Sequence, residues 1–144
     1  GLDDVQFVHG SPTDEDEYLV TLHDAIEPLM VSPSTLTFFG HTHLQGSFST
    51  TAGNQGDVSY PEYQTVGQIE TSDLPLKEGV RYLINPGSVG QPRDGNWRAA
   101  FALFDTESRV ITFCRTPYNL KGAQDRILAA NLPLRLATRL AAGR

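Results

Sequence analysis

Residues 36–43 are Leu36-Thr37-Phe38-Phe39-Gly40-His41-Thr42-His43, an apolar, β-rich run that passes directly into a loop with two histidines. The pattern predicts a strand that ends at Gly40. Because His41 and His43 are two residues apart, their side chains would project to the same side of extended backbone and could face one centre. Neutral imidazole is a common ligand of Zn, Mn, Fe and Ni. The stretch therefore predicts a strand that carries two candidate metal ligands to its end.

Two other predicted strands also end in a glycine-bearing loop with polar side chains. The strand over 5–8 ends at His9-Gly10-Ser11-Pro12, and the strand over 81–85 ends at Pro86-Gly87-Ser88-Val89-Gly90. Ligands of open sheets collect at such strand ends. If the three strands are neighbours, three of the four histidines, His9, His41 and His43, meet at one edge. The competing interpretation of each histidine is structural, with its ring satisfied by water or backbone.

The rest of the chain predicts helices and a hairpin around these strands. Thr13 is a candidate N-cap of a first helix, which we expect to end near Ile26 or Glu27 because Pro28 follows. The apolar runs 98–104 and 110–114 predict a β-hairpin. Asn119 is a good N-cap for a helix after Pro117, and Pro133 opens a last helix. We expect residues 47–79 to be mostly irregular, with one strand candidate over 64–69 and room for a hairpin.

Composition limits the class of protein and of partner. The chain has 144 residues, which suits one domain. It has 11 Lys and Arg against 17 Asp and Glu, and this acidic balance argues against nucleic acid as the main partner. No apolar run approaches the length of a membrane span. The one cysteine, Cys114, cannot form an internal disulfide, so we expect a cytoplasmic protein with a buried, inert thiol.

The histidine loops resemble those of a known enzyme superfamily. Phe39-Gly40-His41-Thr42-His43 resembles the GHxH motif of calcineurin-like metallophosphoesterases, and Val8-His9-Gly10-Ser11-Pro12 resembles the preceding histidine motif of that superfamily. Residues 85–95 are similar to a loop of its small bacterial and archaeal phosphodiesterase branch. The resemblance implies hydrolysis of phosphomonoesters or phosphodiesters by a metal-bridging hydroxide. It also implies two divalent ions (Mn, Fe, Ni or Zn) in the complete enzyme.

The resemblance also implies roles for particular residues. His9 and His41 would serve one metal ion and His43 the other. Asn85, Ser88 and Arg93 become candidates for lining the substrate pocket. No residue of this chain is assigned a catalytic role beyond metal binding.

The motifs that the family carries before these loops, D-x-H, GD and GNH(D/E), do not occur here. Residues 1–144 therefore resemble a single unit, the C-terminal half of a metallophosphoesterase domain. The fold implied is α/β (α+β), the second half of a two-sheet αββα sandwich. We expect mostly one mixed sheet, a C-terminal β-hairpin and flanking helices.

Three imidazoles without a bridging carboxylate cannot hold two cations close together, because neutral ligands do not offset the repulsion between the ions. We expect the isolated chain to be inactive and to bind no metal, or one ion weakly. Its expected partners are a phosphate-ester small molecule and either the missing N-terminal half or a second copy, through an exposed apolar face. Two alternatives stay open: a stand-alone hydrolase with one metal on three histidines, and a non-catalytic binding or regulatory module derived from a phosphoesterase.

Overall fold

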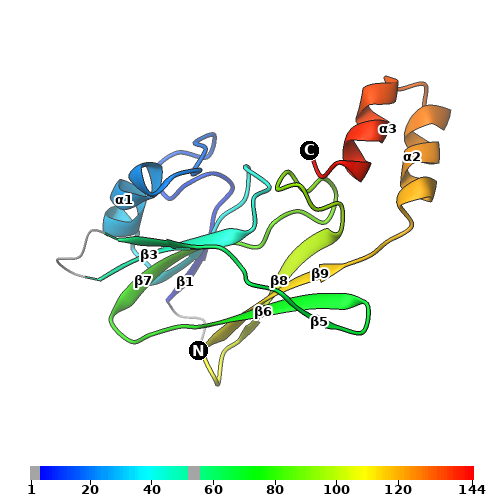
Figure 1. Ribbon diagram of the computed structural model, residues 1–144. Helices are drawn as coiled ribbons and strands as arrows, with labels where there is room; N and C mark the ends of the chain where they lie inside the picture. The colour runs from blue at the N-terminus through cyan, green and yellow to red at the C-terminus, as the bar shows by residue number, and fades with distance from the viewer. Residues whose placement is uncertain (1–3, 52–55) are drawn as a thin grey trace.

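The computed structural model describes residues 4–51 and 56–144, which form two β-sheets with helices at their margins (Figure 1). Sheet A has five strands in the spatial order β1-β2-β7-β3-β4. Strands β1, β2 and β7 run parallel, and β3 lies antiparallel to both β7 and β4. Their bounds are Val5–Phe7 (β1), Leu36–Phe38 (β2), Val80–Asn85 (β7), Gly46–Thr51 (β3) and Asp57–Ser59 (β4). The strands expected over 5–8, 36–39 and 81–85 are confirmed.

Sheet B is a four-stranded antiparallel sheet in the order β5-β6-β9-β8. Its strands are Gln64–Val66 (β5), Ile69–Pro75 (β6), Ala99–Asp105 (β8) and Val110–Thr116 (β9). The predicted hairpin is confirmed as β8–β9, whose register pairs Asp105 with Val110. The two-sheet α+β class is confirmed, and the hairpin turns out to be half of a second sheet rather than an addition to a single one.

Strand β7 shows how the layers are packed. Leu83 points to one face of sheet A, where it packs with Phe39, Phe48 and the helix α1 (Leu22–Val31). Tyr82 and Ile84 point to the other face, where they pack against Ile111 and Phe113 of sheet B. A strand that is buried on both faces carries a continuous apolar run. Sheet A is therefore the middle layer, between α1 and sheet B (Figure 1).

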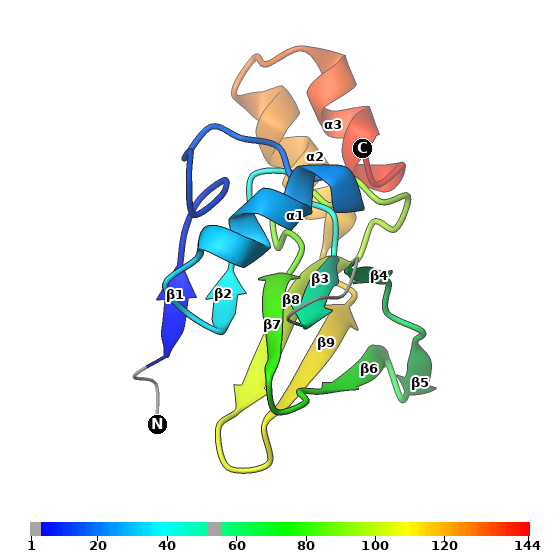
Figure 2. The ribbon, with the colours of Figure 1, turned by 90° about the vertical axis from the view of Figure 1, so that its left-hand side faces the viewer.

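The chain ends in two antiparallel helices, α2 (Leu120–Ala129) and α3 (Leu134–Ala141), which lie beyond the end of β9 (Figure 2). The side chain of Asn119 accepts a hydrogen bond from the amide of Gly122 at 2.9 Å, so the predicted N-cap is confirmed. The last helix begins directly after Pro133, also as predicted. In the part of the chain that is described, no helix has the length and apolar character needed to cross a membrane.

The prediction for the first helix was wrong at both ends. The helix begins at Leu22, because Thr21 and Asp24 form a capping box: each side chain binds the backbone N–H of the other residue. Thr13 lies in a loop, where its N–H donates to Ser11 Oγ at 3.2 Å. Pro28 lies inside the helix, which continues for three more residues.

The segment 47–79 is more regular than its composition indicates. It contains most of β3 and all of β4, β5 and β6 in the described part. The strand predicted over 64–69 is two strands, β5 and β6, joined as a hairpin at Gly67, which has φ of 64°. Ser47 and Phe48 of β3 are buried between neighbouring strands, so pairing with β4 and β7 outweighs a sequence rich in Ser and Gly.

Candidate metal centre at the carboxyl edge of the parallel strands

The three parallel strands end level with one another. Phe7 pairs with Phe38, and Phe38 pairs with Ile84. The loops that follow these residues therefore leave sheet A at the same edge, the position where open sheets bind ligands. This register is why His9, His41 and Asn85 become neighbours although they are far apart in the sequence.

His9 and His41 are in direct contact. Their ring centroids lie 4.6 Å apart, with the rings edge to face. The backbone holds the two loops together, since the amide of Gly40 donates to the carbonyl of His9 at 2.8 Å. The expected meeting of these two histidines is thus present in the structure.

Tyr18 is a site residue that the sequence did not single out. Its ring centroid lies 4.0 Å from that of His41. Tyr18 reaches this position because the chain turns sharply after His9. A Cβ on Gly10 would lie 2.5 Å from the carbonyl oxygen of Glu15, so only glycine allows so close an approach. The short separation in sequence between Tyr18 and His9 was one available signal.

His43 is held by the third loop of this edge, residues 86–98, which follows β7. Its Nδ1 lies 2.8 Å from the carbonyl oxygen of Gln91, which holds the ring and leaves Nε2 as the second nitrogen. The backbone of both His41 and His43 has φ of 61°, in the left-handed region. Histidine is among the residues enriched there, and such strained backbone clusters at functional sites. The backbone of the histidine loop is therefore not extended, so the premise that placed His41 and His43 on the same side was wrong. Convergence of all three rings on one centre stays a prediction.

Asn85 lies beneath the histidine loop and is 1% exposed. Its Nδ2 donates to the carbonyl of Gly40 at 3.1 Å and to Thr42 Oγ1 at 2.8 Å, and its Oδ1 accepts from the amide of Gly87 at 2.9 Å. Every polar atom of the side chain is therefore engaged within the protein. Asn85 therefore holds the backbone carbonyl of the residue before His41 and the side-chain hydroxyl of the residue after it.

The other two candidates for the substrate pocket, Ser88 and Arg93, lie on the same loop as Gln91. Ser88 Oγ accepts from the amide of Gln91 at 2.9 Å, which places it at a turn. The amide of Arg93 donates to the carbonyl of His43 at 3.2 Å. Within the described structure Arg93 Nε is buried without a hydrogen-bond partner. Arg93 thus follows the His43 loop closely, and its guanidinium has unused donor capacity.

A buried polar network ties these loops to sheet B. Arg115 of β9, 3% exposed, forms an ion pair with Asp94 and donates from Nε to the hydroxyl of Tyr63 at 2.9 Å. Tyr63 in turn donates to Gln45, two residues after His43. Burial by itself would lower the pKa of Arg115, but the hydrogen bonds with Asp94 and Tyr63 raise it above its ordinary value. The guanidinium stays charged and anchors both site loops.

The donors present fit part of a metal site. Within residues 4–51 and 56–144, no group of three or more His, Cys, Asp or Glu side chains is arranged to hold a metal ion. His9 and His41 supply two adjacent imidazoles. His43 is oriented by a backbone carbonyl, the way in which metal-ligating histidines are commonly held. These residues can supply the nitrogen ligands of a centre that takes other ligands from elsewhere.

The sequence and the fold of the chain are similar to those of known proteins. The chain matches no family model. It is 34% identical over 140 residues to an uncharacterized protein of Methanocaldococcus jannaschii, a match that covers 97% of this chain and 52% of that protein. It is also 34% identical to a metallophosphoesterase from Sphaerobacter thermophilus of known crystal structure, with a TM-score of 0.84 over 98% of this chain and 56% of the other. The chain thus spans about half the length of these relatives.

A hypothetical protein from Pyrococcus horikoshii has the same fold, with a TM-score of 0.63 and 22% identity over 96% of this chain and 46% of that one. The resemblance to metallophosphoesterases that the histidine loops indicated is confirmed by the Sphaerobacter structure. So is the metallophosphoesterase-like fold, which has two sheets and three helices in the part of the chain that the structure describes.

Proposed function

We propose that this chain supplies the histidine side of the active site of a metal-dependent phosphoesterase. The observation that supports this most directly is the contact between His9 and His41 at the edge of sheet A, in a chain that shares its fold with a metallophosphoesterase. His9 and His41 would bind one divalent ion (Mn, Fe, Ni or Zn) through imidazole nitrogen, and His43 would bind the second through Nε2. Such ions, when bound, polarise the phosphoryl group and lower the pKa of water.

The protein's own residues would position the reactants. Gln91 holds the His43 ring, Asn85 holds the backbone of the histidine loop, and Tyr18 restricts the His41 ring. Arg93 would contact a phosphate oxygen, since a guanidinium presents several donors that match phosphate geometry. The proposed substrates are phosphomonoesters or phosphodiesters.

We further propose that the carboxylate ligands come from polypeptide that corresponds to the part of the relatives this chain does not match. The supporting observation is that β1 of sheet A and β8 of sheet B each have one paired neighbour among the described residues, as do β4 and β5 at the opposite edges. Phe7 on β1 is 73% exposed and Leu103 on β8 is 59% exposed, so these edges offer apolar surface as well as backbone groups.

Sedimentation velocity over a range of concentrations tests this assignment of the partner. We expect the chain to associate weakly with itself at most, with Phe7→Ser reducing any association and the exposed Val66→Ser leaving it unchanged. A stable dimer that binds metal tightly would show that a second copy completes the site.

Metal content and turnover test the function itself. We expect the purified chain, equilibrated with Mn²⁺, Ni²⁺ or Zn²⁺, to hold at most about one weakly bound ion, because neutral imidazoles alone do not hold two cations close together. His41→Ala should remove this binding. The matched control is His23→Ala, since His23 lies on the exposed side of α1.

Hydrolysis of a generic phosphodiester with added Mn²⁺ should be negligible for the chain alone. Robust turnover that is lost in His43→Ala would instead favour a stand-alone single-metal hydrolase. Metal binding unchanged by both His9→Ala and His41→Ala would contradict the proposal and favour a non-catalytic module.

We place the activity in a cytoplasm, because the sole cysteine, Cys114, is a buried free thiol whose pKa is raised by burial.

A further inference from the structure

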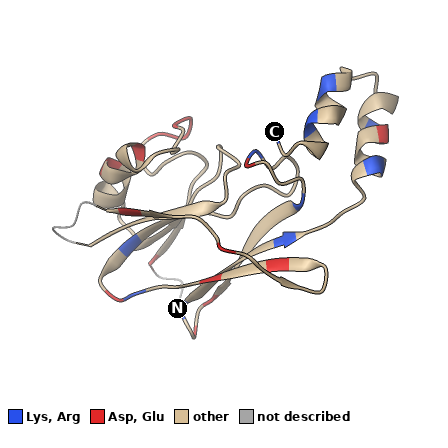
Figure 3. Cartoon of the chain, in the orientation of Figure 1, with Lys and Arg blue, Asp and Glu red and all other residues tan. Residues whose placement is uncertain are grey.

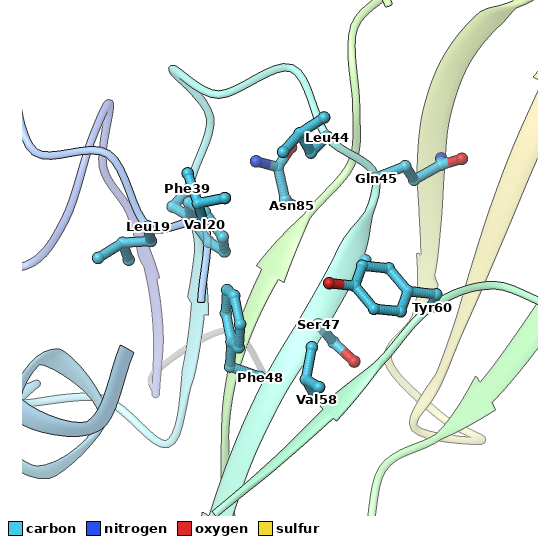
Figure 4. Close-up of a pocket in the computed structure, with 11 residues that line it drawn as sticks. Leu19, Val20, Phe39, Leu44, Gln45, Ser47, Phe48, Val58, Tyr60 and Asn85 are labelled. Atoms are coloured by element: carbon cyan, nitrogen blue, oxygen red, sulfur yellow. The ribbon is translucent and has the colours of Figure 1, made fainter. Parts of the chain in front are cut away.

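Sheet A has a small apolar pocket beside the histidine loop (Figure 4). Its volume is about 70 Å³. Leu19 and Val20, which precede α1, form one wall, and Phe48 and Val58 of β3 and β4 form another (Figure 4). Because these walls are hydrocarbon, the pocket favours an apolar occupant.

Two of the polar side chains that line the pocket, Asn85 and Gln45, are already engaged. Asn85 donates to Gly40 and Thr42, as described above. Gln45 Nε2 donates to the carbonyls of Pro86 and Phe101, each at 2.9 Å, and its Oε1 accepts from Tyr63. Next to Asn85 and Gln45, a charged or strongly polar group would have to displace these bonds, whereas a hydrocarbon group would not.

Gly46 creates part of the space. A Cβ at this position would lie 3.1 Å from the carbonyl oxygen of Ser59 and 3.4 Å from the ring of Tyr60. Without a side chain there, Tyr60 can lie across the start of β3 as a rim of the pocket (Figure 4). An engineered apolar cavity of about 150 Å³ binds benzene, so about 70 Å³ suits a short alkyl group of about two to four carbons.

The pocket lies against the two ends of the histidine loop, and Asn85, which also lines it, donates to Gly40 and Thr42 on either side of His41. Phe39 directly precedes the histidine loop and Leu44 directly follows His43, and both line the pocket. Tyr18, whose ring lies against His41, is adjacent along the chain to Leu19.

We infer that this pocket is a subsite for a short alkyl arm of the phosphate ester. The inference rests on the proposed function, since it takes the phosphate to bind at His9, His41 and His43. The preferred substrates are then phosphate esters of small, unbranched or singly branched aliphatic alcohols. Esters whose alcohol is bulky or charged next to the phosphate fit poorly.

Chain-length series measured by NMR titration test this inference. The first series is the free alcohols from ethanol to butanol, which need no metal. We expect them to shift the backbone amides of Phe39, Leu44 and Phe48, with affinity that rises about fourfold per methylene until the pocket is full. Val58→Phe, which fills the pocket, should abolish the trend. Val66→Phe, on the exposed face of β5, should retain it. Val58→Ile serves if the larger residue impairs folding, and should shorten the optimal chain.

The second series is the n-alkyl phosphates from methyl to butyl, with Mn²⁺ present. We expect the same dependence on chain length, flattened in Val58→Phe, whereas His41→Ala weakens all members equally. Binding of methyl phosphate at the histidine loop without any alkyl trend would overturn the subsite and leave the proposed function standing. An alcohol trend without phosphate binding would overturn the assignment of the pocket to a phosphate ester and leave it as an apolar site, while the proposed function is tested separately by metal binding at His9 and His41. Amide shifts scattered over other surfaces would overturn the subsite outright.

Discussion

Asn85 is the side chain on which the shape of the histidine loop depends. It donates two hydrogen bonds to that loop and accepts one from its own loop, all within the protein. It also lines the apolar pocket. Its proposed role is therefore to position the loop, and its contribution to a substrate pocket comes from its place in the wall rather than from a free amide.

Removing this amide should destabilise the fold and loosen the histidine loop. For Asn85→Ala we expect a loss of about 1–3 kcal/mol for each polar group left buried without a partner. Urea denaturation measures the loss, and the exposed Gln68→Ala is the control, with a change below about 0.5 kcal/mol. An Asn85→Ala protein as stable as the parent would contradict the assigned role.

The histidine pair was predictable from the sequence, and the residues that hold it were not. Three strand-end motifs, each with glycine, were enough to bring His9 and His41 together. Tyr18 acts through the contact of its ring with the His41 ring, and Gln91 acts through its backbone carbonyl, which binds His43. No pattern of side chains in the sequence encodes either contact. Asn85 was a candidate from its motif, but its buried position was visible only in the fold.

Helix α1 shows what decides an element when two signals compete. The acidic run after Thr13 has the composition of a first helical turn, yet the helix starts at the capping box of Thr21 and Asp24. The amide of Thr13 is satisfied by Ser11 instead. The strand content of residues 46–75 was underestimated for a related reason. Ser and Thr are read as loop residues in a sequence, but the Ser- and Thr-rich strand β3 pairs readily with β7 once that strand offers an edge.

The capping box makes the stability of α1 depend on pH. Hydrogen bonds from the backbone and side chain of Thr21 lower the pKa of Asp24 below its ordinary value of 3.8. A carboxylate whose pKa is lower in the folded state than in the unfolded state stabilises the fold at pH values above the unfolded-state pKa. This contribution is lost as the pH falls through the folded-state pKa.

We therefore expect Asp24→Asn to lower the melting temperature at about pH 7, and the difference from the parent to shrink toward about pH 3. The effect is small because Asp24 is solvent-screened. Thermal denaturation followed by circular dichroism at both pH values gives the comparison, with Glu27→Gln on the same helix as control. A difference that grows on acidification would be inconsistent with the capping role.

The whole molecule depends on the junction between its two sheets. Sheet A carries the histidines, and sheet B carries Arg115, whose guanidinium binds Asp94 in the third loop and Tyr63. Gln45 continues this network into the histidine loop. Figure 3 shows basic residues at this junction and also on the helices α2 and α3. Sheet B therefore holds the site loops in place together with sheet A.

Breaking this junction should cost far more than breaking a surface ion pair. Arg115→Met leaves Asp94 without its cation, and we expect a loss of about 3–5 kcal/mol. The comparison variant is Arg98→Met, which breaks the more exposed pair with Glu70 and should cost about 0–1 kcal/mol. Guanidinium denaturation measures the free energy of unfolding of both variants. Equal losses in the two variants would contradict the role of Arg115 as a buried anchor.

The central claim is that the carboxyl edge of sheet A presents its imidazoles as metal ligands. Long-range ¹H–¹⁵N NMR of the histidine rings during a titration with Zn²⁺ tests it at the ligating atoms. We predict that the ring nitrogens of His9 and His41 shift together as one weakly held ion binds, that Nδ1 of His43 stays bound to Gln91, and that His23 does not respond. Zn²⁺ that shifts His23 as strongly as His9 and His41, or shifts neither of those two rings, would contradict the claim.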